Sequence, residues 1–158
     1  MLALLEGDAQ QQMKAVTNLC SRNLREFLPE ISRYLAHEPC PEAAALLIEA
    51  LQEQDVSEEF TLVKDGVDYV FWPQEVTPVA ESEGFAQALR LLGEWLSNDH
   101  PDYYEMCRTL LIHDCYVFLP LSYEAAEAYD LAAGIFEKVS LMMDDGQLYK
   151  DFRNRKTV

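Results

Sequence analysis

The sequence predicts a mainly α-helical fold: a single-domain antiparallel bundle of five to six helices with one small β-hairpin at about residues 60–72. Apolar residues recur at three- and four-residue steps along most of the chain, which is the spacing of helices buried on one side. Proline or a capping residue stands at the start of several of these segments. The clearest alternating pattern surrounds a single Asp-Gly dipeptide, which is typical of a hairpin turn. A length of 158 residues is that of one domain.

The N-terminal third of the chain predicts three helices. Asp8 is the expected N-cap of a first helix whose apolar residues continue to Leu28. Pro29 disfavours a helical conformation at Leu28 and suits the first turn of a short second helix. Pro41 opens a third helix that ends near Gln54.

The hairpin is predicted from residues 60–72. A two-residue type I′ loop at Asp65-Gly66 would fix the pairing of the two strands. A lone hairpin is marginally stable in water, so one of its faces must pack on helices. The expected pairs are Phe60 with Phe71, Leu62 with Tyr69 and Lys64 with Val67. The packed face would carry Phe60, Leu62, Tyr69 and Phe71, and the outer face Thr61, Val63, Asp68, Val70 and Trp72.

The second half of the chain is again helical. Residues 73–84 form a polar connection, the best candidate for a mobile loop. A helix follows from residue 83 to Asn98 or Asp99, Pro101 starts the next one, Ser122 is a candidate cap of the last, and Asp145-Gly146 ends it. Residues 115–119 either continue a helix over residues 102–118 or form a short third strand beside the hairpin. The basic C-terminal tail, about residues 147–158, either frays or folds back on the acidic middle of the chain.

Charge is the strongest global feature of the sequence. The chain has 28 acids and 12 bases, a net charge of −16. Residues 1–33 are neutral and residues 138–158 carry +2, whereas residues 34–137 hold 21 acids and three bases, a net of −18. This layout excludes a general electrostatic footprint for nucleic acid or an anionic membrane. It favours a basic protein as the partner.

Several features favour a cytoplasmic protein. No apolar run reaches the roughly 18 to 20 residues that span a bilayer. The N-terminus lacks the basic region of a secretory signal. Four irregularly spaced cysteines indicate reduced thiols rather than a disulfide framework. The sequence leaves the oligomeric state and the identity of the partner open.

His113, Asp114 and Cys115 are the three side chains that a cysteine hydrolase would use. On a helix, successive residues turn by about 100°, so these three should point in different directions and not converge. Asp114 falls among apolar residues and is expected to be a buried structural carboxylate that needs a hydrogen-bond donor. We therefore predict no catalytic residues.

A zinc site is the other chemical interpretation of these residue types. Four ligands could be assembled from five candidates, but they lack the paired short spacings of structural zinc sites. No glycine-rich phosphate loop or other cofactor motif occurs, so neither a metal nor a cofactor is predicted. The five candidates are His37, Cys40, Cys107, His113 and Cys115.

The sequence favours a non-enzymatic protein-binding module, most simply an inhibitor or immunity-type protein that neutralises a basic toxin or nuclease domain. One alternative is an acidic adaptor or secretion chaperone that holds a client segment, for instance by strand addition at the hairpin edge. A small enzyme without a recognisable motif is the other. Aromatic residues beside the acids would supply binding energy. The candidate partner-binding residues are Glu58, Glu59, Asp68, Tyr69, Trp72, Glu75, Asp102, Tyr103, Tyr104 and Glu105.

Overall fold

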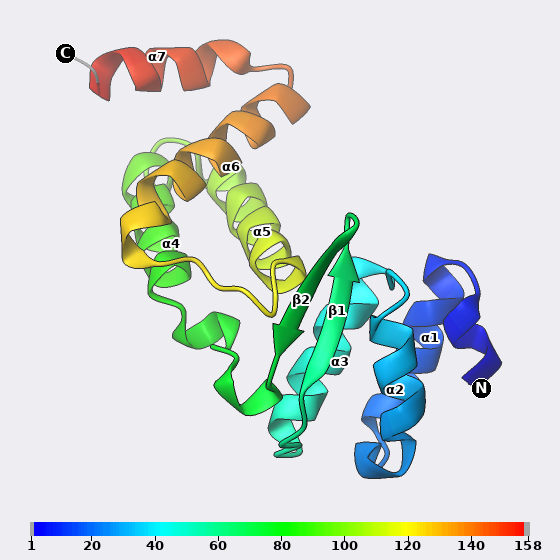
Figure 1. Cartoon of the computed structure of the whole chain (residues 1–158). Coiled ribbons are helices and arrows are strands. Elements are labelled where there is room, and N and C mark those ends of the chain that lie inside the picture. The colour runs from blue at the N-terminus through cyan, green and yellow to red at the C-terminus, as the bar shows by residue number, and fades with distance from the viewer. Residues whose placement is uncertain (1, 157–158) are drawn as a thin grey trace. The chain divides into compact units, whose positions relative to one another are not determined.

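The computed structural model describes residues 2–156 and shows a mainly helical chain with one antiparallel hairpin (Figure 1). The predicted fold class is confirmed, although the described residues form seven α-helices, slightly more than predicted. They divide into two compact units. Unit 1 holds residues 2–78 and 116–121, and unit 2 holds residues 79–115 and 122–156. That the whole chain folds as one domain stays a prediction.

Unit 1 contains three α-helices and the hairpin, with the first helix packed on the third and the second packed on the first strand. A short 3-10 helix, η1 (Leu2–Glu6), precedes α1 (Ala9–Cys20), and η2 (Leu24–Phe27) leads into α2 (Leu28–Leu35) and α3 (Pro41–Glu53). Asp8 caps α1 as predicted, because its Oδ1 accepts the Gln11 backbone N–H at 2.8 Å. The core of this unit is aliphatic and includes Leu19, Leu24, Ile31, Leu35, Leu47, Ile48 and Leu51.

The first helix is shorter than predicted, because the chain turns after Cys20. The Asn23 side chain accepts the Arg25 backbone N–H at 3.2 Å and so starts the separate helix η2. Gln54 holds this turn from across the unit, since its Oε1 accepts the Leu24 N–H at 2.9 Å. Apolar spacing alone could not reveal this break, because Leu19 before it and Leu24 after it are both buried.

The hairpin follows the predicted register. Strands β1 (Phe60–Lys64) and β2 (Val67–Phe71) pair antiparallel, with Phe60 opposite Phe71, Leu62 opposite Tyr69 and Lys64 opposite Val67. Asp65 and Gly66 have φ values of 53° and 76°, as a type I′ turn requires. The Phe60, Leu62 and Phe71 side chains are buried, which confirms the predicted inner face.

The turn gives a direct test of this geometry. Gly66→Ala should lower the free energy of unfolding by about 1 kcal/mol, because a side chain at positive φ is strained even where space is open. Gly134 lies inside a helix with open space around its missing side chain, so Gly134→Ala should raise stability by roughly 0.5–1 kcal/mol. Urea denaturation of both variants measures these shifts. Two shifts of the same sign would contradict the turn assignment.

Unit 2 is built from four helices around an aromatic cluster. They are α4 (Glu83–Leu96), the greater part of α5 (Pro101–Val117), α6 (Ala128–Met142) and α7 (Gly146–Lys156). Helices α4 and α6 pack side by side, and α7 packs on α6. Trp95 and Phe136 lie 6.4 Å apart between ring centroids, and Phe152 of α7 lies 4.4 Å from Trp95 and 5.1 Å from Phe136.

The structure resolves or corrects several predictions for the second half of the chain. Residues 115–117 continue α5, so the helical alternative holds and no third strand forms among the described residues. Ser122 does not cap the last helix: a 3-10 turn, η5 (Ala125–Glu127), precedes α6, and Glu127 Oε2 accepts the Glu124 N–H at 3.1 Å. The basic tail, as far as Lys156, forms helix α7 and folds back on the middle of the chain, where Phe152 contacts Trp95 and Phe136, so of the two predicted alternatives folding back is the one observed. Its last two residues lie outside the described part.

The polar connection after β2 is more structured than predicted. It contains η3 (Pro73–Glu75) and η4 (Val79–Glu81). The Gln52 side chain of α3 donates to the backbone carbonyls of Pro73, at 3.1 Å, and Val76. Val76 and Val79 are buried. These two apolar residues hold the connection in place, although its overall composition is polar.

Candidate protein-binding site

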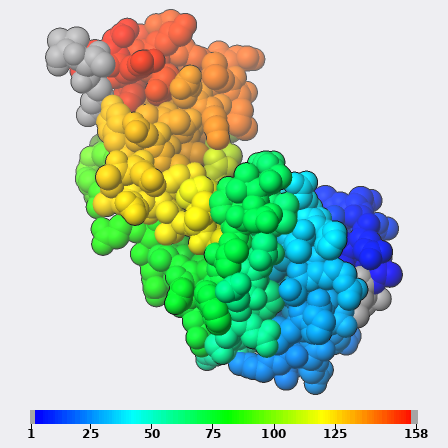
Figure 2. All heavy atoms as spheres, viewed as in Figure 1, coloured from blue at the N-terminus to red at the C-terminus, as the bar shows by residue number. Residues whose placement is uncertain are grey.

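The outer face of the hairpin presents apolar side chains to solvent. Val70 is 60% exposed and Trp72 is 41% exposed, both on the face away from the helices. Val67, beside the turn, is 50% exposed. Figure 2 shows the green atoms of this segment at the surface of unit 1. Exposed large apolar groups that lie together are typical of interaction sites.

Acidic side chains surround these apolar groups. Glu58 and Glu59 precede β1, Asp68 lies on β2, and Glu75 follows it in η3. All four side chains are exposed, and no ion pair involves them in the described part of the chain. We call Glu58, Glu59, Asp68, Val70, Trp72 and Glu75 the hairpin surface.

Tyr69, the remaining predicted hairpin residue, lies on the inner face and is half-buried. The Lys64 Nζ atom lies 5.7 Å from the centre of its ring. This contact indicates that Tyr69 has a structural role on the packed face of the hairpin, as its position in the strand predicts.

Lys64 fastens the hairpin to unit 1 in a way that the sequence did not reveal. Its Nζ donates to the backbone carbonyls of Val117, at 2.6 Å, and Leu119, at 3.3 Å. Burial lowers the pKa of Lys64 from its ordinary value. These two carbonyls lie at and after the end of α5, where helix carbonyls lack partners within the helix. These hydrogen bonds of Lys64 therefore hold in place the hairpin whose outer face is exposed.

The other four predicted residues lie in unit 2, at the start of α5. Tyr103 donates its hydroxyl to Asp145 Oδ2 at 3.0 Å, and this hydrogen bond raises the pKa of Tyr103. The Tyr104 ring lies against Gly93 of α4, where an added Cβ would be 3.7 Å from it. Both rings are half-buried, while Asp102 and Glu105 are exposed. The ten residues thus fall into two groups on different units.

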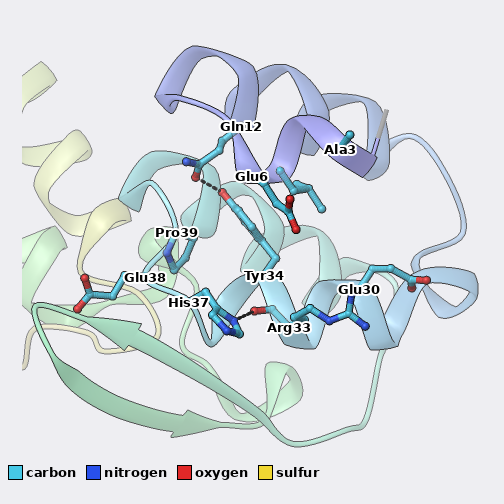
Figure 3. A pocket seen from close by; sticks show the side chains of 10 residues that line it. Ala3, Glu6, Gln12, Glu30, Arg33, Tyr34, His37, Glu38 and Pro39 are labelled. Atoms are coloured by element: carbon cyan, nitrogen blue, oxygen red, sulfur yellow. Dashed lines mark hydrogen bonds between the residues drawn. The ribbon is translucent and has the colours of Figure 1, made fainter.

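Unit 1 also has a groove of about 630 Å³ (Figure 3). It lies where η1, α1, α2 and the turn after α2 meet. Gln12 is its central polar group: its Oε1 accepts from the Tyr34 hydroxyl and the Cys40 backbone N–H, both at 2.7 Å. The other lining residues are Ala3, Leu5, Glu6, Glu30, Arg33, His37, Glu38 and Pro39.

The polar groups of this groove make hydrogen bonds within unit 1. The His37 Nδ1 atom is hydrogen-bonded to the Arg33 carbonyl at 2.7 Å. Burial raises the pKa of the Tyr34 hydroxyl, which makes it a poor proton donor or base near neutral pH. Tyr34 and His37 thus both make hydrogen bonds within unit 1.

The structure corrects one expectation about the His-Asp-Cys segment. The His113 Nδ1 and Asp114 Oδ1 atoms do approach each other, at 3.2 Å, because neighbouring side chains on a helix can lean together. Asp114 also receives a hydrogen bond from Lys138 Nζ at 3.3 Å, and its side chain is 22% exposed rather than fully buried. Cys115 is buried and takes no part in this contact.

The candidate zinc ligands are not brought together. His37 and Cys40 belong to unit 1, whereas Cys107, His113 and Cys115 belong to unit 2. Within residues 2–156, no three histidine, cysteine or acidic side chains are placed to hold a metal ion. Burial raises the pKa of both Cys107 and Cys115 to about 12, which indicates unreactive thiols.

A thiol titration tests this assignment. In a Cys20→Ser/Cys40→Ser variant at pH 8, Cys107 and Cys115 should react with a disulfide reagent only after unfolding. The thiolate is the reactive form, and with a pKa of about 12 only roughly one thiol in ten thousand is ionised at pH 8. Fast reaction of either thiol in native buffer, at the rate seen in urea, would show that the site is open.

Comparisons with known proteins give one match. The chain is 25% identical over 135 residues to the TPR repeat-containing protein YsoA of Bacillus subtilis (strain 168). The alignment covers 85% of this chain and 40% of YsoA, so this chain spans less than half of that relative's length. No protein family and no solved structure matches the sequence. Among the described residues, no helix has the length and apolar character needed to cross a membrane.

Proposed function

We propose that this chain is a non-enzymatic, cytoplasmic protein-binding module whose hairpin surface receives a basic protein. The observation that carries the proposal is the exposed pair Val70 and Trp72, carried on a hairpin whose carboxylates, with those of its flanking segments, form no ion pair with any described residue. Unpaired like charges repel one another, and a cationic partner would relieve that repulsion.

The two kinds of residue would do different work. The carboxylates of the hairpin surface would speed the encounter and select basic partners. Trp72 would supply affinity, because large aromatic side chains that are buried at the centre of an interface contribute most of the binding energy. Lys64 holds the hairpin that carries these residues in place, which supports this role, since a preformed surface loses little conformational entropy on binding.

The similarity to YsoA supports a binding role. Tetratricopeptide repeats are helix–turn–helix units of about 34 residues, and stacked helical repeats form extended binding surfaces. Unit 1 also contains helices that pack against one another, α1 on α3. The hairpin sets this chain apart from a purely helical repeat, so the binding surface proposed here is its own.

Within this class, we infer an inhibitor or immunity-type protein that covers the basic face of a toxin or nuclease domain. Small size and the net charge of −18 in residues 34–137 support this role. One observation favours the second candidate, an adaptor or secretion chaperone: β2 pairs with β1 alone, which leaves a strand edge open for a client segment.

Affinity capture tests the proposal. Immobilised wild-type chain should retain a basic protein from a lysate of its own source, and an Asp68→Lys/Glu75→Lys variant should lose it. Glu26→Lys/Glu137→Lys is the matched control, because both of its sites are exposed, lie outside the hairpin surface and change the net charge equally. Equal retention by the two variants, or capture of acidic proteins only, would contradict the proposal. A folded basic protein indicates the inhibitor, and an extended segment of a larger protein indicates the adaptor.

A further inference from the structure

The open edge of β2 has backbone groups without partners. A two-residue loop makes its flanking pair, Lys64 and Val67, a hydrogen-bonded pair. Hydrogen-bonded and non-hydrogen-bonded pairs alternate, so the N–H and C=O groups of Asp68 and Val70 point away from β1. No hydrogen bond joins these groups to another described residue.

The two edges of the hairpin differ in exposure. β1 packs beside α2, and its outward residues Thr61 and Val63 are half-buried. On β2 the corresponding residues Asp68 and Val70 are exposed. The edge of β2 is therefore the more accessible one within unit 1.

We propose that β2 binds its partner by strand addition: an extended segment with alternating basic and apolar residues pairs with the edge of β2. This inference rests on the proposed function in its adaptor form, and specifies how the hairpin surface would recognise its partner. Asp68 and Val70 would exchange backbone hydrogen bonds with the segment, as edge strands do when they take up a peptide. The five residues of β2 have a length of roughly 17 Å, enough for about five residues of partner.

The side chains beside β2 determine the composition of that segment. On the outer face, Asp68 attracts a lysine or arginine through its charge, and Trp72 does so through its ring. On the opposite face, Val67 offers apolar surface to a β-branched residue. Because strand side chains alternate between faces, the segment should alternate cationic and apolar residues.

A defined probe tests this mode of binding. The peptide acetyl-Lys-Val-Lys-Val-Lys-Val-amide should bind more tightly than its Glu-Val counterpart. On binding to the wild-type chain, it should slow amide hydrogen exchange of Asp68 and Val70 at least tenfold, because those N–H groups gain partners. The amides of Thr61 and Val63, on the other edge, should not slow.

Proline scanning supplies the matched variants. Val70 and Thr61 lie opposite each other in the same non-hydrogen-bonded pair, so proline at either site removes an outward N–H and no hydrogen bond between the strands. Val70→Pro should weaken binding of the Lys-Val peptide at least fivefold, the effect of about one lost hydrogen bond. Thr61→Pro should leave it unchanged.

The outcomes distinguish an error in the strand-addition model from an error in the basic-partner proposal. If the Lys-Val peptide binds, yet Val70→Pro has no effect and the Asp68 and Val70 amides stay unprotected, strand addition is wrong while the basic-partner proposal stands. If Thr61→Pro abolishes binding and Val70→Pro does not, the edge of β1 is the site and the assignment to β2 is wrong. Equal binding of the Lys-Val and Glu-Val peptides would overturn the proposed function together with this inference.

Discussion

Trp72→Ala is expected to weaken binding of the basic partner about 30-fold, the effect of a central aromatic residue worth about 2 kcal/mol. Trp72 is 41% exposed and has no stacking partner among the described residues, so its removal should cost little folding stability. The loss should appear mainly as faster dissociation, because buried contacts act on the off-rate. Surface plasmon resonance with the captured partner measures both rates.

Tyr129→Ala is the matched control for this experiment. Tyr129 is an aromatic residue of similar exposure, 48%, but it lies on α6 of unit 2, outside the hairpin surface. Its removal should leave the affinity unchanged, and Trp72→Phe should retain more binding than Trp72→Ala. A large loss in Tyr129→Ala with none in Trp72→Ala would place the site in unit 2.

Phe136→Ala is expected to produce the largest loss of stability, about 3–5 kcal/mol. Phe136 is 2% exposed and contacts Trp95 of α4 and both Tyr149 and Phe152 of α7. Its deletion leaves a cavity at the point where these helices meet and removes the anchor of the C-terminal helix. Urea denaturation followed by circular dichroism measures the change.

Leu141→Ala on the same helix supplies the control, since Leu141 is 62% exposed and its truncation should change stability by no more than about 0.5 kcal/mol. Phe136 lies in unit 2 and the hairpin surface in unit 1, so the affinity of the folded fraction should not change. A Phe136→Ala loss as small as that of Leu141→Ala would show that the aromatic cluster does not hold unit 2 together.

The parts of the fold that sequence predicted correctly are those that local chemistry determines. Asp65-Gly66 specifies a turn type, and the turn type specifies the strand register. Pro29, Pro41 and Pro101 stand in the first turn of their helices because proline lacks the N–H that has no partner there.

The parts that were wrong or missed depend on distant contacts. Gln54 stabilises a turn 30 residues earlier in the chain, and Lys64 reaches a carbonyl 53 residues later. The C-terminal helix folds back because Tyr149 and Phe152 join an aromatic cluster, whereas its basic composition left fraying and folding back as alternatives. No pattern within a short window records such pairings.

Some features of the candidate site could likewise be predicted from the sequence, and others could not. The exposure of its acids follows from their charge, and the outer position of Trp72 follows from strand alternation. Tyr69, Tyr103 and Tyr104 are amphipathic, so the sequence could not separate a structural role from a binding role. The structure gives each of them an internal contact, which leaves Trp72 as the aromatic residue free to bind.

The central claim is that the carboxylates of the hairpin surface steer a basic partner. Glu58→Lys/Glu59→Lys reverses two of them. Glu6→Lys/Glu26→Lys is the control, because these two residues are also exposed, lie in the same unit and change the net charge by the same amount. Glu30 is a poor control site, since its Oε2 atom is buried without a hydrogen-bond partner.

The association rate constant as a function of salt tests this claim most directly. For the wild-type chain it should fall steeply as the ionic strength rises, because at physiological salt charges are screened over about 8 Å. Glu58→Lys/Glu59→Lys should slow association at low salt by about tenfold or more and flatten the salt dependence, while the control pair changes both far less. A rate constant that does not depend on salt, or an equal effect of the two pairs, would contradict the claim and leave the acidity as a property of solubility alone.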